Sequence, residues 1–312
     1  MQHLITSSEA VAKFCEQFFL KNPVLYVAAG TVQLHHLIGD EVGKVSSSGV
    51  LVGVDGRQYV LTVLHGAIED IGLLGREVST GQVGVKPIGK YPVYARQSLN
   101  KDGGRGDPIV DFTFFPLPDN FVPIRNLASE SESAGAKSVL SNEFEIQELP
   151  IIPIEGIDRV NCCCGGALPK PKSPELGTES IFNFVHGLVF NPQKSDDTYW
   201  YFDVPKELES GDLDLSGMSG APIFNESGIP IALLCGDCTK DEQGNSIPRQ
   251  FWGVSMNHAI GLTKETLHGC LEKFGNLPFD KKIKVATNAC DLSSHFYANT
   301  SDLLWQFSQN SK

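Results

Sequence analysis

The sequence predicts a mainly β protein built from two strand-rich regions. Its 312 residues include 31 Gly and 18 Pro, scattered among short runs of Val, Ile, Leu and Phe. Glycine and proline at this spacing favour tight turns and leave few stretches long enough for extended helices. Strand-like runs fill residues 24–120 and 143–262, and the polar, serine-rich segment 121–142 between them reads as an interdomain linker. A hydrophobic content of 41% allows each region to bury a core.

Helices are expected only at the two ends of the chain. Residues 1–23 form an N-terminal helical segment, in which apolar side chains recur at helical spacing until Asn22-Pro23 ends the helix. Residues 263–312 form a C-terminal helix, capped by Thr263, and an extension that the sequence leaves uninterpreted.

Charge and composition exclude several classes of partner. The net charge is −12, with 37 acidic against 25 basic residues and no basic cluster, so no nucleic-acid partner is expected. No run approaches the roughly 20 apolar residues that cross a bilayer, and the first residues do not resemble a signal sequence. The adjacent cysteines at 162–164 cannot all pair, which favours a reducing compartment. We therefore expect a cytoplasmic protein without a membrane contact.

The strongest local signal is a serine flanked by glycines, at Ser219 in the run SGMSGAP. Small neighbours let the backbone bring two N–H groups together to face a developing oxyanion. Those donors are predicted to be Gly217 and Ser219, while Ser216 reads as a bystander.

A serine hydroxyl is a poor nucleophile unless a base accepts its proton and a third group orients that base. His65 is the best candidate base, because it follows the strand-like run Tyr59–Leu64 and turns out of it at Gly66. Asp111 lies within an apolar, strand-like run, where a lone carboxylate is costly unless it is paired. The sequence also leaves open a structural pairing of Asp111 with Arg105.

Taken together, LTxxHG at His65, DFT at Asp111 and GxSGxP at Ser219 resemble the three signature blocks of the trypsin/chymotrypsin-like serine peptidase family, in the same order. The resemblance covers about residues 48–262 and is closer to intracellular or bacterial-type members. It implies a chymotrypsin-like double β-barrel, a His-Asp-Ser triad and hydrolysis of peptide bonds through an acyl-enzyme, with a protein or peptide as substrate and no cofactor.

The same resemblance implies where a substrate side chain is bound. Leu213 would lie at the base of the primary specificity pocket, and Leu234, Cys235 and Gly236 would form one wall, while Asp214 could reach the same space. The chain also departs from the secreted members of the family. Met218 stands where they carry an aspartate, which excludes activation by an ion pair with a new N-terminus.

Other readings of these residues stay open at this stage. Cys235 and Cys238 have the spacing of half a zinc site, but no matching second pair follows, so we expect no metal. The chain could be a trypsin-fold binding module without turnover. It could also be an α/β-hydrolase-type esterase, although Pro222 opposes the helix that must follow the serine of such enzymes.

Overall fold

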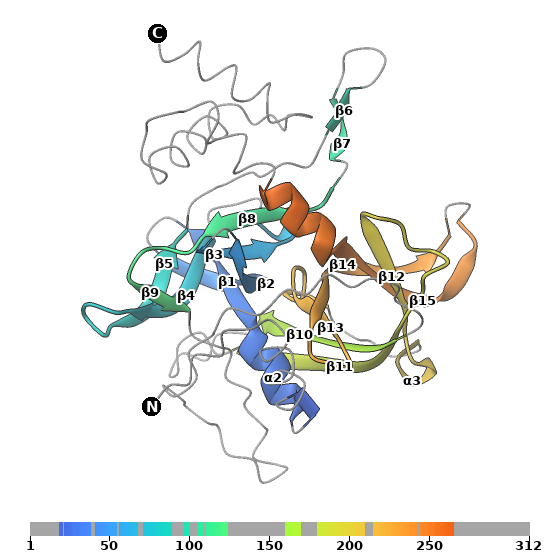
Figure 1. The fold of residues 1–312 in the computed structure, drawn as a ribbon, viewed down its shortest axis with the longest axis horizontal. Helices are drawn as coiled ribbons and strands as arrows, with labels where there is room; N and C mark the ends of the chain where they lie inside the picture. Colours follow the sequence, from blue (N-terminus) through green and yellow to red (C-terminus); the bar gives the residue numbers. More distant parts are fainter. Residues whose placement is uncertain are drawn as a thin grey trace.

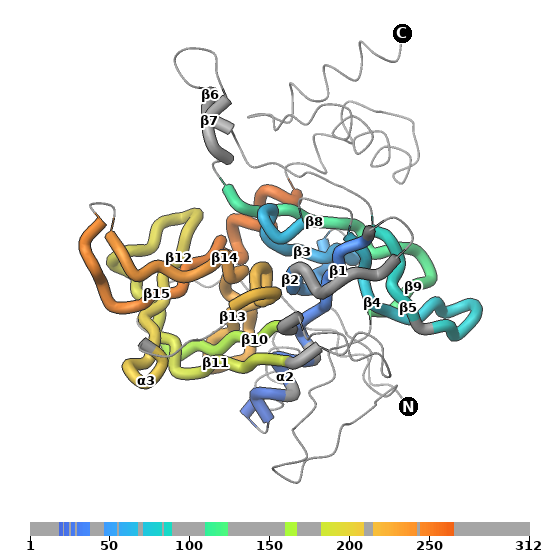
Figure 2. Tube along the Cα trace, turned by 180° about the vertical axis from the view of Figure 1, so that it is seen from behind, coloured from blue at the N-terminus to red at the C-terminus, as the bar shows by residue number. Residues whose placement is uncertain are grey.

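The computed structural model describes residues 19–20, 22–38, 41–54, 56–67, 71–88, 97–99, 105–108, 110–123, 160–169, 180–209, 215–241 and 244–264. Two antiparallel β units make up most of this part of the chain, as the sequence predicts (Figure 1). Seen from behind, the two units lie side by side (Figure 2). None of the helices in the described ranges is long and apolar enough to cross a membrane.

The first unit is a curled sheet of seven strands. In chain order they are β1 (Thr31–Ile38), β2 (Glu41–Val54), β3 (Arg57–Thr62), β4 (Ile71–Glu77), β5 (Val83–Pro87), β8 (Thr113–Pro116) and β9 (Phe121–Pro123). Their order is β5-β4-β1-β2-β3-β8, with β9 paired to β4. Among the described strands, β5 and β8 are not joined to each other, so a fully closed first barrel stays a prediction. A separate hairpin is formed by β6 (Gln97–Leu99) and β7 (Arg105–Pro108).

The second unit is a closed barrel. Its strands are β10 (Asn161–Pro169), β11 (Ser180–Phe190), β12 (Tyr199–Asp203), β13 (Pro222–Asn225), β14 (Pro230–Lys240) and β15 (Ser246–Ser255), and they are ordered β10-β11-β12-β15-β14-β13. A short helix, α3 (Lys206–Glu209), follows β12. The three adjacent cysteines alternate along β10: Cys162 and Cys164 belong to one apolar cluster and Cys163 to another.

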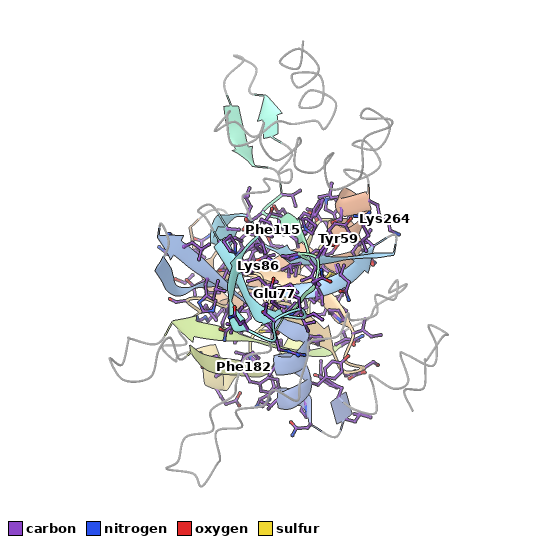
Figure 3. All side chains as sticks on the ribbon, turned by 90° about the vertical axis from the view of Figure 1, so that its left-hand side faces the viewer. Tyr59, Glu77, Lys86, Phe115, Phe182 and Lys264 are labelled. Carbon is purple, nitrogen blue, oxygen red and sulfur yellow. The ribbon has the colours of Figure 1, made fainter. Side chains whose placement is uncertain are left out.

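An apolar cluster joins the two units. It combines Val50 and Leu61 of the first sheet with Leu233 and Val254 of the barrel. Strands β2 and β10 also contact each other directly. Figure 3 views the molecule from the side of the first sheet, with Tyr59 and Phe115 labelled on the neighbouring strands β3 and β8. Because buried apolar surface resists separation, this cluster fixes how groups on the two units face one another.

The chain has a helix before β1 where the sequence predicted a strand. Residues 19–20 are helical and the rest of the predicted helix lies outside the described residues, but a further helix, α2 (Pro23–Gly30), occupies a stretch that was expected to be a strand. Proline suits the first turn of a helix, because its missing N–H would have no partner there. Figure 1 shows α2 beside the barrel, where the Tyr26 hydroxyl donates to the Gly228 carbonyl oxygen at 2.7 Å.

The structure also differs from the prediction at the start of the linker and at the start of the C-terminal helix. The first sheet runs through β9 to Pro123, so the segment 121–142 does not begin as a linker, and its residues from 124 onward lie outside the described residues. The C-terminal helix covers 256–264 and directly follows β15, instead of starting at Thr263. Ser255 caps this helix by accepting a hydrogen bond from the His258 N–H at 3.2 Å.

Candidate active site

His65 lies where the first sheet turns out of strand β3. The strand ends at Thr62, and His65–Ala67 form a single 3₁₀ turn closed by the bond from the Ala67 N–H to the Leu64 carbonyl at 2.9 Å. Leu64 and Ala67 are buried, whereas 45% of the His65 side chain is exposed. The turn therefore presents the imidazole at the edge of the core, within reach of solvent.

Asp111 approaches this imidazole from the segment before β8. Its Oδ1 accepts the His65 backbone N–H at 2.9 Å, and its Oδ2 pairs with His65 Nδ1. The sequence placed Asp111 inside a strand, but β8 begins at Thr113, and a bond from the Phe112 N–H to the Val110 carbonyl at 3.0 Å makes a tight turn around Asp111. Val110 and Phe112 are buried on either side. The turn allows both neighbours to enter the core while the carboxylate faces the histidine.

Ser219 comes from the second unit, in the turn formed by residues 216–220 before β13. Its Oγ lies 2.8 Å from His65 Nε2. Gly217 and Gly220 have φ values of 79° and 82°, in the left-handed region that favours glycine. Three predicted side chains from distant parts of the chain thus form one hydrogen-bonded series, Asp111–His65–Ser219.

The backbone N–H groups of the turn fall into two classes. The N–H groups of Met218, Gly220 and Ala221 donate to the carbonyls of Leu215, Leu234 and Met218, at 2.9, 2.7 and 2.9 Å. Within the described part of the chain, the N–H groups of Gly217 and Ser219 have no such acceptor. These two N–H groups are the ones predicted as donors to an oxyanion.

The predicted specificity pocket stays a prediction, because the structure describes only part of its proposed lining. Leu213 and Asp214 lie outside the described residues. The side chain of Leu234 is buried in the barrel core, and its backbone exchanges hydrogen bonds with Gly220 and Ala221 of the serine turn. Cys235 is also buried and points its sulfur at the Asp111 carbonyl, 4.0 Å away. Gly236 borders the Trp252 ring, since an added Cβ would lie 3.5 Å from the indole nitrogen.

Two residues near the acid and the nucleophile were not singled out from the sequence. The hydroxyl of Tyr199, on β12, accepts the Asp111 backbone N–H at 3.2 Å, and burial raises the pKa of this tyrosine to about 12. Ser48, on β2, donates to two carbonyls of the serine turn. Neither residue lies in a recognisable motif, so the sequence carried no signal for them.

Comparison with known proteins adds little to this geometry. No protein-family model and no curated sequence matches the chain. A solved structure, the inactive form of Rv3671c protease, is similar at 11% sequence identity and a TM-score of 0.41, covering 79% of this chain and 94% of that one.

Burial raises the pKa of four cysteine thiols, of which Cys235 lies beside Asp111. Burial raises the pKa of Cys162 and of Cys163 from 9.0 to about 12, and it holds the pKa of Cys164 and of Cys235 well above the ordinary value. The nearby Asp111 carboxylate raises the pKa of Cys235 further.

In the described ranges no three His, Cys, Asp or Glu side chains gather as metal ligands would. The open alternative of an Asp111–Arg105 pair is untested, because the Arg105 side chain is outside the described set.

Proposed function

We propose that the chain is a serine endopeptidase of the chymotrypsin-like, double-barrel kind, with His65, Asp111 and Ser219 as its catalytic triad. The observation that carries this proposal is the hydrogen-bonded series from the carboxylate to the imidazole to the hydroxyl. Each group has the chemistry that its place in the series requires: an acid, a base and a nucleophile.

In the proposed reaction, Ser219 Oγ attacks the carbonyl carbon of a peptide bond while His65 Nε2 accepts the hydroxyl proton. Asp111 accepts from Nδ1–H, which fixes the tautomer that leaves Nε2 free as a base and stabilises the imidazolium that forms. The imidazolium then gives its proton to the leaving amine, and an acyl-enzyme remains. Water attacks this ester by the same route, with His65 again as base, and releases the acid.

The backbone N–H groups of Gly217 and Ser219 supply the electrostatic part of this mechanism. Negative charge develops on the carbonyl oxygen of the substrate as the tetrahedral intermediate forms. The N–H groups of Gly217 and Ser219 have no acceptor among the described residues, so they can donate to that oxygen at no cost to the fold. Removal of a single donor of this kind costs on the order of 10²–10³ in kcat.

The two alternatives fit the geometry less well. In an α/β-hydrolase the serine is followed at once by a helix, whereas here Pro222 opens strand β13. A binding module without turnover has no need of an aligned base and nucleophile. An experiment that measures nucleophile reactivity and turnover together separates the peptidase from the binding module.

The decisive experiment measures labelling by a fluorophosphonate probe together with turnover of a peptide library. We expect wild-type protein to be labelled, and Ser219→Ala to abolish labelling and to lower kcat by about 10⁶-fold, with His65→Ala nearly as severe. Ser216→Ala is the matched control, since it removes an exposed hydroxyl from the same turn and should leave both measurements unchanged. Labelling that persists in Ser219→Ala would refute the proposed nucleophile. Wild-type protein that shows neither labelling nor cleavage would favour the binding module, whereas labelling without peptide cleavage would favour an esterase.

A further inference from the structure

We infer that the Ser48 hydroxyl is a positioning group for the oxyanion donors: its hydrogen bond to the Gly217 carbonyl, made from the first sheet to the second unit, orients the serine turn. This inference rests on the proposed function and deepens it. Ser48 touches no reacting atom, so its part would be to hold the groups that do.

Ser48 contacts the turn twice. Its backbone N–H donates to the Ser219 carbonyl oxygen at 2.8 Å, and its Oγ donates to the Gly217 carbonyl oxygen at 2.8 Å. The residue is completely buried on β2. Sequence separations of about 170 residues make these bonds a long-range constraint, since the hydroxyl and its acceptor are 169 positions apart.

Two peptide units of the serine turn are fixed by hydrogen bonds at both their carbonyl and their N–H. The unit between Gly217 and Met218 is held at both ends, by Ser48 at its carbonyl and by the Leu215 carbonyl at its N–H. The unit between Ser219 and Gly220 is likewise held at both ends, by the Ser48 N–H and by the Leu234 carbonyl.

Between these two fixed units lies the one that carries the Ser219 N–H. Its carbonyl, on Met218, accepts from Ala221, while its N–H has no acceptor within the described part of the chain. A peptide unit is planar, so fixing its neighbours and its carbonyl sets the direction of its N–H. The preceding donor, on Gly217, depends on the same hold. Gly217 has no side chain to limit its backbone, so the bond at its carbonyl restricts the rotation that would otherwise be open to it.

The carbonyl of Ser48 is bonded to the strand that leads to the histidine. The Thr62 hydroxyl, three residues before His65, donates to the Ser48 carbonyl at 2.6 Å. Ser48 therefore links the end of β3, which leads to the base, to the turn that carries the nucleophile and the oxyanion donors. Losing its hydroxyl should misalign the donors while the backbone bonds keep the turn in place.

The neighbouring residue provides a matched control. Ser47 is as fully buried as Ser48, but its Oγ has no hydrogen-bond partner among the described residues. Ser47→Ala and Ser48→Ala therefore delete the same buried atom from adjacent positions of one strand. Only the second deletion removes a bond to the turn.

The test measures kcat and KM on a peptide substrate, and the inhibition constant of a peptide boronic acid, which mimics the tetrahedral intermediate. For Ser48→Ala we expect kcat to fall roughly 10- to 100-fold, less than for loss of a whole oxyanion donor. The boronate should bind more weakly by a similar factor, while KM changes less than about twofold, because the donors act in the transition state. Ser47→Ala should keep wild-type kcat, KM and boronate affinity.

Three results would overturn the inference: wild-type kcat in Ser48→Ala, equal losses in the two alanine variants, or a loss confined to KM. If Ser48→Ala does not fold, as judged by its circular dichroism, Ser48→Cys decides the question, since a thiol of similar size is a weaker donor. Its kcat should then lie below that of wild type with KM retained, and a wild-type kcat would count against the inference. Failure of the proposed function is distinct, because then Ser219→Ala would retain wild-type activity or peptide turnover would be absent altogether.

Discussion

The close packing around Gly220, where the two units meet, allows us to predict how much Gly220→Ala lowers the free energy of unfolding. A Cβ added at this position would overlap the hydroxyl of Thr62 and the carbonyl of Ser48, both on the first sheet. The backbone there has φ of +82°, which costs a residue with a side chain about 1–2 kcal/mol. Overpacking of a filled interior adds about 1–3 kcal/mol. Gly220→Ala should therefore destabilise the folded state by roughly 2–5 kcal/mol.

The control variant is Gly244→Ala, which isolates the effect of the overlap. Gly244 has a φ of +84°, but an added Cβ would meet none of the described residues within 4 Å. The two variants share the same backbone strain and the same loss of unfolded-state entropy, so these contributions cancel in the difference between them. The remaining difference, about 1–3 kcal/mol, is the cost of steric overlap across the interface.

Urea denaturation followed by tryptophan fluorescence and circular dichroism measures this difference. With a slope of about 3 kcal/mol per molar urea, the midpoint of Gly220→Ala should lie roughly 0.3–1 M below that of Gly244→Ala. Coincidence of the two probes establishes that one transition is being compared. Equal midpoints for the two variants would refute the close approach of the first sheet to the serine turn, and with it the contact on which the site depends.

Two further predictions concern protonation. Activity should rise as the pH increases from about 5 to 8, because a general base must be unprotonated and histidine side chains titrate in this range; a flat pH–kcat/KM profile would contradict the role of His65. Separately, Cys162 and Cys163 should react slowly with iodoacetamide in the native protein at pH 8 and rapidly in urea. Raised pKa values leave almost none of the reactive thiolate in the folded state, and mass spectrometry of the labelled peptides would detect the contrary result.

The groups proposed to do chemistry could be predicted from the sequence because the residues next to each one in the chain mark it. Ser219 has glycines beside it, and His65 directly follows an apolar strand. Asp111 stands out as a carboxylate within an apolar run, and it is paired, although in a turn and not in a strand. Ser48 and Tyr199 could not be found in this way. Their contacts with Gly217 and Asp111 join positions 169 and 88 residues apart, and nothing local marks them.

The helices were harder to predict for a different reason. The α2 segment, PVLYVAAG, is apolar on every side, so it shows neither the 3.6-residue nor the 2-residue period that separates helix from strand. Tertiary burial decides the outcome: Tyr26, Val27 and Ala28 are all buried. The helix over 256–264 was missed because its first residues follow β15 without a loop. Its cap, Ser255, is also the last residue of that strand.

Packing and hydrogen bonds from uncharged groups support the serine turn in the described part of the chain. Met218 is fully buried in the apolar cluster of the barrel, and an added Cβ at Gly166 would lie 2.9 Å from its Cα, so the turn is anchored by packing. Apart from the bond to His65, the described hydrogen bonds of residues 217–221 are made by backbone groups and the Ser48 hydroxyl. None of these groups ionises near neutral pH. The turn should therefore keep its shape between about pH 5 and 8. It follows that a rise in kcat/KM with pH would report the protonation of the proposed base and not the assembly of the oxyanion donors.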